Sequence, residues 1–294
     1  QTLFETIDKL KDTDANILIL GENGTGKDVI ANLLCCCSPR ADKPFVRIDL
    51  GTIPEQLFES ELFGHRKGAF TDAKSDKQGR FEIATGGTLF LDEIANLTLP
   101  MQAKLLTAIE KQEITRLGAT APLSIDVRLI CATNGDIHEM VENGEFRQDL
   151  LYRINTIELH IPPLRERGKD IELLAEHFLQ RYSKKYKKDI RGFSSTALKK
   201  LGEYTWPGNV RELQSAIERA VILASGFTLY PEDFMLKTTA NRRLKNVNLN
   251  LDELEREAIE KALQQSGGNM NQAAELLGIS RFSLYRKIEK QGNR

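Results

Sequence analysis

A glycine-rich loop between an apolar strand and a helix constrains the fold of this chain more than any other feature. The loop GENGTGKD follows the apolar run NILIL of residues 16–20 and opens a helical pattern. Glycines let the backbone curl so that its N–H groups point inward, and the helix N-terminus adds partial positive charge, so this arrangement binds phosphate. We therefore predict a nucleotide site formed by Gly21, Glu22, Asn23, Gly24, Thr25, Gly26, Lys27 and Asp28.

The residue after the lysine departs from the general phosphate-binding motif. Lys27 is placed to reach the β- and γ-phosphates of ATP, and the following residue is usually Ser or Thr, whose hydroxyl binds Mg²⁺. Here that residue is Asp28. We expect water or a carboxylate to take the place of the hydroxyl in a site that holds both ATP and Mg²⁺.

Two carboxylates end a second apolar strand, TLFLDE. Asp92 is placed to hold Mg²⁺, directly or through water, and Glu93 to orient and polarise an attacking water. A further strand over residues 127–133 ends in Thr133 and Asn134 and is expected beside the Asp92 strand. These two side chains either sense the γ-phosphate or position water, or they cap the following helix.

Apolar runs and helical patterns alternate over the first half of the chain. Strands are predicted at residues 16–20, 45–50, 88–91, 127–133 and 156–161, with helices at 28–37, 100–111 and 135–143. This alternation predicts an α/β fold with a parallel sheet covered by helices on both faces. After Pro162 the pattern is helical only, at 170–186, 194–204 and 209–224, with Ser194 as an N-cap.

These patterns divide the chain into four segments. We expect an α/β nucleotide-binding subdomain over residues 1–162 and a small helical lid over 163–236. A linker over 237–250 contains basic residues and no acidic one, which is typical of flexible, solvated chain. An all-α DNA-binding domain is expected over 251–294.

The last segment fits a helix-turn-helix. A helix over 271–277, a turn containing Gly278 and an N-cap at Ser280 precede a basic helix over 281–290. Leu284 is expected in the core, whereas Phe282 fits either side. The residues expected to contact bases and phosphates in the major groove are Arg281, Ser283, Arg286 and Lys287. A dimer face is expected from Leu251, Leu254, Ala258 and Ala262, which recur at helical spacing.

Composition narrows the class of protein. In 294 residues, 41 Lys+Arg balance 42 Asp+Glu, which excludes a uniformly basic nucleic-acid binder but not a local basic patch. No apolar run reaches the ~18–20 residues of a membrane helix. Three of the four cysteines are consecutive, so we expect reduced thiols and a cytoplasmic protein. The four histidines lack metal-ligand spacing. Because Gln1 lies inside a helical pattern, we expect this chain to be a piece of a larger protein.

Seven motifs, spread over nearly the whole chain, carry a resemblance to one family. They are GENGTGKD, ESELFGHRKGAFTDA, GGTLFLDEI, FRQDLLYRI, IPPLRERGKDI, WPGNVREL and GISRFSLYRKI. The sequence resembles the AAA+ ATPases that activate bacterial sigma-54 RNA polymerase, the NtrC-like enhancer-binding proteins. The resemblance implies a AAA+ core and lid followed by a Fis-type helix-turn-helix that binds DNA as a dimer. The family commonly has an acidic residue at the position of Asp28.

The resemblance also gives a role to a surface loop. The family's GAFTGA loop, which grips sigma-54 and moves with ATP hydrolysis, is matched by Gly68, Ala69, Phe70, Thr71, Asp72 and Ala73. Phe70 and Thr71 match the contact pair. Asp72 replaces the usual Gly, and its charge is expected to alter the flexibility of the loop and its contact with sigma-54. A plain hairpin is the alternative, but an exposed Phe in a Gly-bounded loop suits a partner contact better.

Three arginines receive roles from the resemblance. Arg147 and Arg153 match arginine fingers that enter a neighbouring subunit's site, which implies a ring, usually a hexamer. A guanidinium offers the planar donors and fixed charge that a transferring phosphoryl group needs. Arg211 matches the lid residue that senses the γ-phosphate. Asp49 stands where the family often has an Asn that holds the catalytic Glu, so we expect its carboxylate to repel Glu93 or share a proton with it.

The expected function is ATP-driven remodelling of the sigma-54 RNA polymerase holoenzyme by a ring bound to upstream double-stranded DNA. The family usually carries an upstream regulatory domain, such as the receiver of a two-component system. Two alternatives stay open. Asp72 and Asp49 suggest a DNA-binding AAA+ regulator that has lost or weakened its sigma-54 contact. Another AAA+ machine, such as a helicase loader, is disfavoured by the intact Phe70–Thr71 pair.

Overall fold

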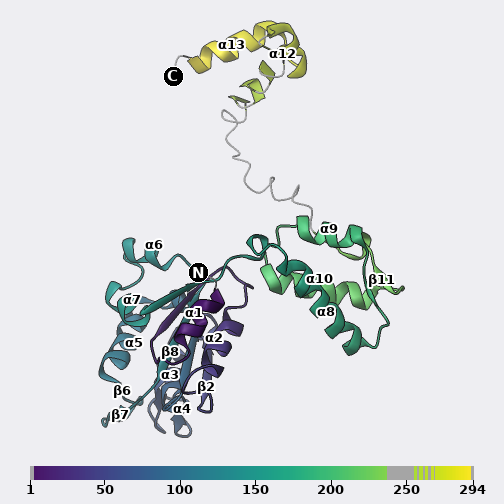
Figure 1. The fold of residues 1–294 in the computed structure, drawn as a ribbon. Coiled ribbons are helices and arrows are strands. Elements are labelled where there is room, and N and C mark those ends of the chain that lie inside the picture. The colour runs from purple at the N-terminus through teal and green to yellow at the C-terminus, as the bar shows by residue number, and fades with distance from the viewer. Residues whose placement is uncertain are drawn as a thin grey trace. The chain divides into compact units, whose positions relative to one another are not determined.

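The chain divides into two compact units, Gln1–Met235 and Leu236–Arg294 (Figure 1). The computed structural model describes residues 3–236, and between 255 and 292 it describes all but residues 257, 261, 264, 265 and 268. The predicted linker over 237–250 and the expected dimer residues Leu251 and Leu254 lie outside the described residues.

A five-stranded parallel sheet forms the centre of the first unit, with the order β2-β5-β8-β1-β9 (Figure 1). The strands are β1 (Ile17–Leu20), β2 (Phe45–Asp49), β5 (Thr88–Asp92), β8 (Arg128–Thr133) and β9 (Ile157–His160). They confirm the five predicted strands and the parallel α/β fold. The three inner strands β1, β5 and β8 are buried on both faces, which is why their sequences are nearly continuous apolar runs, whereas the edge strands β2 and β9 include exposed charged or polar residues.

Helices cover both faces of this sheet. One face packs on α1 (Leu3–Leu10) and α2 (Lys27–Cys36) through a cluster that includes Ile19, Phe90 and Ile130. The other face packs on the larger cluster that includes Leu18, Leu89 and Leu91. The helices on that side are α3 (Glu55–Phe63), α4 (Arg80–Ile83), α5 (Leu99–Lys111), α6 (Ile137–Glu142) and α7 (Gln148–Ile154). Adjacent strand positions thus feed opposite clusters, as the pleat requires.

The first unit also has short turns at the carboxyl ends of two strands and two small strand pairs outside the central sheet. The turn η1 (Leu50–Thr52) follows β2 directly, and η2 (Ile94–Asn96) follows β5 after Glu93. Two small antiparallel strand pairs lie outside the sheet. In one, β3 (Gly64–His65) pairs with β4 (Lys77–Gln78), and in the other, β6 (Glu113–Ile114) pairs with β7 (Leu123–Ser124).

The lid contains the three predicted helices, α8 (Asp170–Tyr186), α9 (Ser195–Glu203) and α10 (Asn209–Leu223). Ser194 is the N-cap of α9, since its Oγ accepts a hydrogen bond from the Ala197 N–H at 3.1 Å. The expectation of helices only was wrong in one detail, because β10 (Gly192–Phe193) pairs with β11 (Thr228–Leu229). The lid also has the turns η3 (Leu164–Glu166) and η4 (Pro231–Asp233).

The second unit has the predicted helix-turn-helix pair, α12 (Met270–Leu276) and α13 (Arg281–Gly292). Its small core contains Ala273, Ala274 and the fully buried Leu284. Ala262, expected on a dimer face, is buried in this same core, because the helix containing it packs on α12 and α13 instead. Ala258 is exposed.

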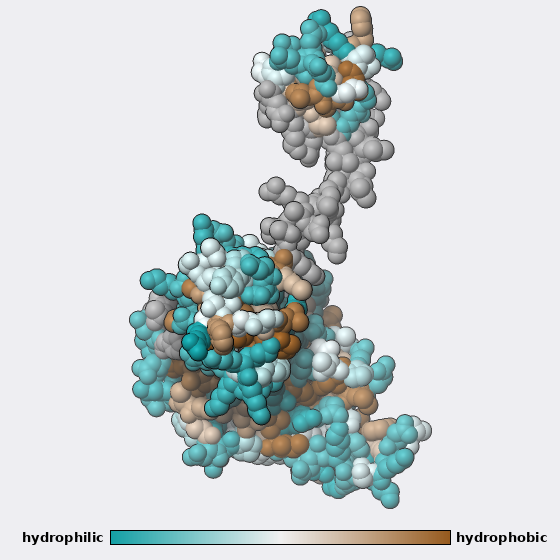
Figure 2. Space-filling view, turned by 90° about the vertical axis from the view of Figure 1, so that its right-hand side faces the viewer, coloured by the Kyte–Doolittle hydropathy of each residue, from teal (hydrophilic) through white to brown (hydrophobic). Residues whose placement is uncertain are grey.

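On the face shown in Figure 2, most described side chains at the surface are hydrophilic, and hydrophobic side chains form separate patches between them. Among the described residues no helix is both long and apolar enough to cross a bilayer.

Candidate nucleotide site and partner surfaces

The phosphate loop runs from the end of β1 to the start of α2, and two of its glycines have left-handed backbone. Gly24 has φ +78° and Gly26 has φ +98°, conformations that favour glycine. A Cβ at Gly24 would lie 2.3 Å from the carbonyl oxygen of Gly208 in the lid, so close backbone approach also requires glycine there. These two positions of the loop therefore suit glycine, and Gly24 allows the loop to approach the backbone of the lid.

Lys27 is buried at the base of this loop. Its Nζ donates to the carbonyl oxygen of Gly21 at 2.9 Å and lies 3.8 Å from Glu93 Oε1. Burial lowers the pKa of the Lys27 ammonium, while the carboxylates of Glu93 and Asp92 oppose that shift. The loop lysine and the two acidic residues therefore meet at one edge of the sheet.

Polar side chains gather where β5 and β8 end, and these two strands are neighbours as predicted. Asp92 is the last residue of β5, and Glu93 follows with φ +57°, a strained backbone for a residue other than glycine. Thr133 ends β8, fully buried, and its Oγ1 accepts from the Gly135 N–H at 3.1 Å. Asn134 is exposed beside it.

Arg47, on the neighbouring strand β2, joins two of the predicted acidic residues and was missed by sequence reasoning. Its Nη1 lies 3.2 Å from Asp28 Oδ2 and its Nη2 lies 3.0 Å from Asp92 Oδ2. The only available signal was a charged residue in the middle of the apolar strand FVRID.

The other oxygen of Asp92 bears on the expected metal ion. Asp92 Oδ1 is buried and has no hydrogen-bond partner among the described residues. Buried carboxylate oxygens need a donor or a cation, and oxygen is the ligand type that Mg²⁺ prefers. These residues therefore fit the predicted magnesium site.

Asp49 ends β2 in register with Asp92. Its Oδ1 accepts from the Gly51 N–H at 3.0 Å, so the carboxylate caps the turn η1. A Cβ at Gly51 would lie 3.4 Å from that oxygen, 3.7 Å from Glu93 Cβ and 2.7 Å from Asn96 Nδ2. The turn carrying Asp49 thus packs closely against the segment carrying Glu93.

The lid holds the phosphate loop directly. Arg165 forms a two-pronged ion pair with Glu22, at 2.7 and 3.0 Å, which lowers the pKa of the Glu22 carboxyl to about 2. Asn209, buried and with φ +51°, donates to Glu22 Oε2 and to the carbonyl oxygen of Asn23, both at 3.0 Å. Arg211 touches the loop through its backbone, whose N–H lies 3.3 Å from the carbonyl oxygen of Gly24.

Sequence reasoning named Glu22 and Arg211 as site residues but did not identify three other lid residues that contact the phosphate loop. Besides Arg165 and Asn209, Arg167 donates to the carbonyl oxygen of Thr25 at 2.9 Å. These three residues belong to the motifs IPPLRERGKDI and WPGNVREL, yet nothing in their spacing indicates which loop atom each would contact.

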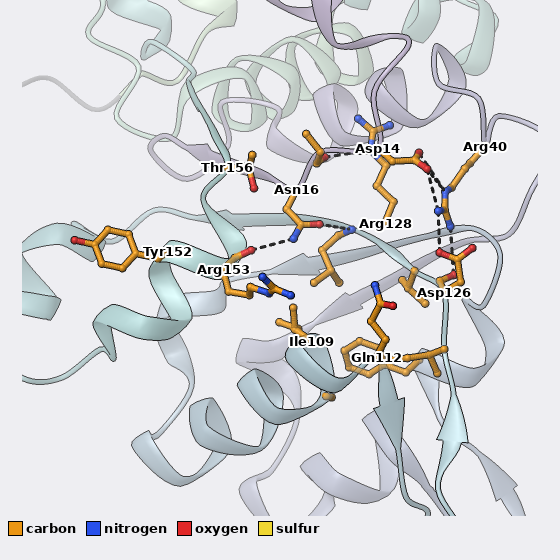
Figure 3. A pocket seen from close by; sticks show the side chains of 16 residues that line it. Asp14, Asn16, Arg40, Ile109, Gln112, Asp126, Arg128, Tyr152, Arg153 and Thr156 are labelled. Atoms are coloured by element: carbon orange, nitrogen blue, oxygen red, sulfur yellow. Dashed lines mark hydrogen bonds and ion pairs between the residues drawn. The ribbon is translucent and has the colours of Figure 1, made fainter.

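The two predicted arginine fingers lie on or beside α7. Arg147 is exposed and pairs with Asp149, with Nη2 at 2.6 Å from Oδ2. Arg153 lines a cavity of about 360 Å³ together with Asn16 and Gln112, and Figure 3 shows these side chains around the cavity. The cavity also touches Arg128 at the first position of β8. Arg153 therefore lies at the amino-terminal edge of the sheet, opposite the phosphate loop of its own chain.

The loop predicted to contact sigma-54 connects β3 to β4. Gly68 has φ +82°, and its N–H donates to the carbonyl oxygen of Ala73 at 2.9 Å, which closes the loop. Phe70 is 37% exposed, and its ring meets that of His65 edge to face at 5.0 Å between centroids. His65 is itself held by the Ser60 hydroxyl at 2.8 Å. Thr71 and Asp72 are exposed.

The four predicted DNA-contacting residues differ in their surroundings. Arg281 and Arg286 are exposed, with the Arg281 guanidinium 5.6 Å from the centroid of the Tyr285 ring. Ser283 shares a hydrogen bond with the Ser280 hydroxyl, and Lys287 is paired with Glu255. Phe282, left open by the sequence, is 84% exposed. Among the side chains of α13 that the structure describes, the exposed basic charge therefore lies at Arg281 and Arg286.

A parallel sheet with a phosphate loop, an acidic strand end beside it and a helical lid define a P-loop ATPase domain of the AAA+ class, here followed by a helix-turn-helix. Comparison with known families gives the particular group. Residues 1–160 match the Sigma-54 interaction domain, residues 165–251 the AAA+ ATPase lid domain, and residues 250–290 the Fis family of bacterial regulatory proteins. The chain belongs to the sigma-54-dependent activator family, as predicted.

Individual relatives agree with this assignment. The chain is 44% identical to the transcriptional regulatory protein ZraR of Salmonella typhimurium, covering 99% of this chain and 66% of ZraR. It is 43% identical to the regulatory protein AtoC of Escherichia coli, covering 97% and 64%. The chain thus spans about two thirds of the length of these relatives.

Solved structures show the same fold. NtrX from Brucella abortus superposes with a TM-score of 0.75 at 31% identity, over 99% of this chain and 67% of NtrX. A second NtrX structure, in complex with ATP, has a TM-score of 0.74 at 30% identity.

Proposed function

We propose that this chain is the ATPase and DNA-binding part of a transcription activator that remodels the sigma-54 RNA polymerase holoenzyme. The observation that carries the proposal is the meeting of Lys27, Asp92 and Glu93 at one sheet edge. The same domain carries the exposed Phe70 in a closed surface loop. Membership of the family supports both halves of the proposal.

ATP hydrolysis is assigned to the residues at the carboxyl edge of the sheet. The loop N–H groups and Lys27 bind the phosphates, and Glu93 orients and deprotonates the attacking water. Mg²⁺, held by Asp92, would neutralise phosphate charge. Thr133 and Asn134 sense the γ-phosphate, and Arg211 reports it to the lid. Arg147 and Arg153 complete the site of a neighbouring subunit in a ring, which we take to be a hexamer.

The route from the nucleotide to the sigma-54 loop is short. Gly51 packs against Glu93 and Asn96, so a shift of Glu93 on hydrolysis presses on the turn η1. Helix α3 begins three residues after that turn and ends at Phe63, directly before Gly64, where the strand leading to the loop starts. A displacement at Glu93 is thereby carried along α3 to Phe70.

The helix-turn-helix tethers the ring to double-stranded DNA upstream of promoters, as a dimer, through Arg281, Ser283, Arg286 and Lys287. For Lys287 this requires release from Glu255. We place this activity in the cytoplasm, because bacterial promoter DNA lies there. Control by a two-component receiver outside this chain fits the family.

One observation favours a second candidate, an ATPase regulator with weakened sigma-54 contact. Asp72 adds an exposed negative charge two residues after Phe70, where the GAFTGA pattern has glycine. Both candidates hydrolyse ATP, so only an assay of promoter opening separates them.

The test is sigma-54-dependent open-complex formation with Phe70→Ala. We expect wild type to open promoters, and the variant to keep its ATPase rate within about twofold while open complexes fall by at least about tenfold, because only the partner contact is removed. Phe227→Ala, which removes an exposed Phe from the lid, is the matched control and should retain both activities. Wild-type ATPase without open complexes would select the second candidate.

A further inference from the structure

The guanidinium of Arg47 lies between two carboxylates of the nucleotide site, 3.2 Å from Asp28 Oδ2 and 3.0 Å from Asp92 Oδ2. We propose that Arg47 is a positioning residue that acts as a tethered cation, orienting Asp92 and competing with the divalent metal ion for its charge. The inference rests on the proposed function, since it concerns the same site.

The strand register fixes this position. Arg47 pairs directly with Phe90, and Asp92 follows two residues along β5, so Asp92 and Phe90 share one face of the sheet. The Arg47 guanidinium lies 5.6 Å from the centroid of the Phe90 ring, which supports its side chain through a cation–π contact. Phe90 is fully buried and stacks on Phe45 at 6.3 Å. The buried Phe90 ring therefore supports the Arg47 side chain in the position from which its guanidinium contacts Asp92.

The carboxylates around Arg47 explain why a positive charge is favourable at this position. Asp28, Asp92 and Glu93 converge on this edge, and Lys27 lies 3.8 Å from Glu93 Oε1. The Asp92 side chain is only 13% exposed, so its charge is poorly hydrated and needs a partner. Arg47 supplies one at Oδ2, and no described residue donates to Oδ1.

The two oxygens of Asp92 thus have different roles. Oδ2 is held by Arg47, and Oδ1 is left for the metal ion. A metal ion and a guanidinium on one carboxylate are like charges, so each weakens the binding of the other. Arg47 therefore keeps Asp92 oriented, and at the same time lowers the affinity of the site for the metal.

The removal of this guanidinium should tighten metal binding. In Arg47→Ala and Arg47→Gln we expect Mn²⁺ to bind the full chain with a non-hydrolysable ATP analogue roughly two- to fivefold more tightly, the range expected for one partly exposed ion pair. Free Mn²⁺, measured by electron paramagnetic resonance, gives the affinity without any turnover. Arg47→Lys, which keeps the charge but loses the two-pronged geometry, should lie between wild type and Ala.

The matched control is Arg191→Ala, which breaks a surface ion pair with Asp189 in the lid and should leave Mn²⁺ affinity unchanged. Unchanged or weaker Mn²⁺ binding in folded Arg47→Gln would overturn the proposal. If Arg47→Ala fails to fold, Arg47→Gln, close in volume, decides. Absence of ATP hydrolysis in wild type would defeat the proposed function instead, because the Mn²⁺ measurement with the analogue does not depend on turnover.

Discussion

At the scale of single residues, the ion pair between Glu22 and Arg165 makes the contact between the lid and the phosphate loop weaker at low pH. The Glu22 carboxyl has its pKa lowered from 4.5 to about 2, chiefly by the Arg165 hydrogen bond. A lowered pKa means that its stabilising contribution is complete above 4.5 and is lost as the pH falls from 4.5 towards 2.

The corresponding prediction compares wild type with Glu22→Gln by urea unfolding. At about pH 6 the variant should be less stable by about 1 kcal/mol or less, a figure reduced because the pair is partly exposed, and the difference should shrink towards about pH 3. Glu166→Gln is the control, since Glu166 lies 3.8 Å from Arg165 and is more exposed. A difference that stays constant over this pH range would contradict the assignment.

The sequence predicted the acidic residues and glycines of the nucleotide site individually, but it did not predict the side chains that contact them. Lys27, Asp92 and Glu93 follow apolar strands, and the carboxyl ends of parallel strands meet at one edge, so sequence order alone brings them together. Arg47 and Asn209 reach the same edge from other strands and from the lid, through side-chain directions that no sequence period encodes.

At the scale of elements, helix α9 depends on a single capping residue. The Ser194 Oγ satisfies the Ala197 N–H, one of the donors that a helix start leaves unpaired. We expect Ser194→Ala to lower the free energy of unfolding by about 1 kcal/mol. Ser195→Ala, at the next and exposed position, should change it by a few tenths at most. Equal losses in the two variants, measured by urea unfolding, would show that the cap contributes nothing.

Element prediction succeeded where a physical constraint repeats along the chain. The central strands are continuous apolar runs because both faces are covered, and the lid helices keep the helical period over two or more turns. The two-residue strands β10 and β11 have no period to detect, and they pair only because α8, α9 and α10 bring Gly192 beside Thr228.

At the scale of the whole molecule, the first unit has chemistry at both edges of one sheet. Lys27 and Glu93 lie at the carboxyl edge, and Arg153 lies in the cavity at the amino edge (Figure 3). A parallel strand of four to six residues, at about 3.3 Å per residue, separates the two edges by well over one side-chain length. For Arg153 to act on the phosphates, it must therefore reach the nucleotide site of another copy of the chain.

This separation leads to a subunit-mixing prediction. Arg153→Ala and Glu93→Gln should each lose hydrolysis by about 100-fold or more, while both still bind ATP. In a mixed ring, an Arg153→Ala chain supplies Glu93 and its Glu93→Gln neighbour supplies Arg153. Random mixing at equal amounts should restore roughly a quarter of the wild-type ATPase rate, because one interface in four combines the intact partners.

The control for mixing is the double variant carrying both substitutions in one chain. Each interface between it and a single variant lacks either Glu93 or Arg153, so adding it to either single variant should restore nothing. An ATPase rate of the mixed single variants no higher than their average would place Arg153 outside the neighbouring site. Recovery that rises with the square of protein concentration at high dilution would further tie the activity to assembly, because the complete site then exists only where two chains meet.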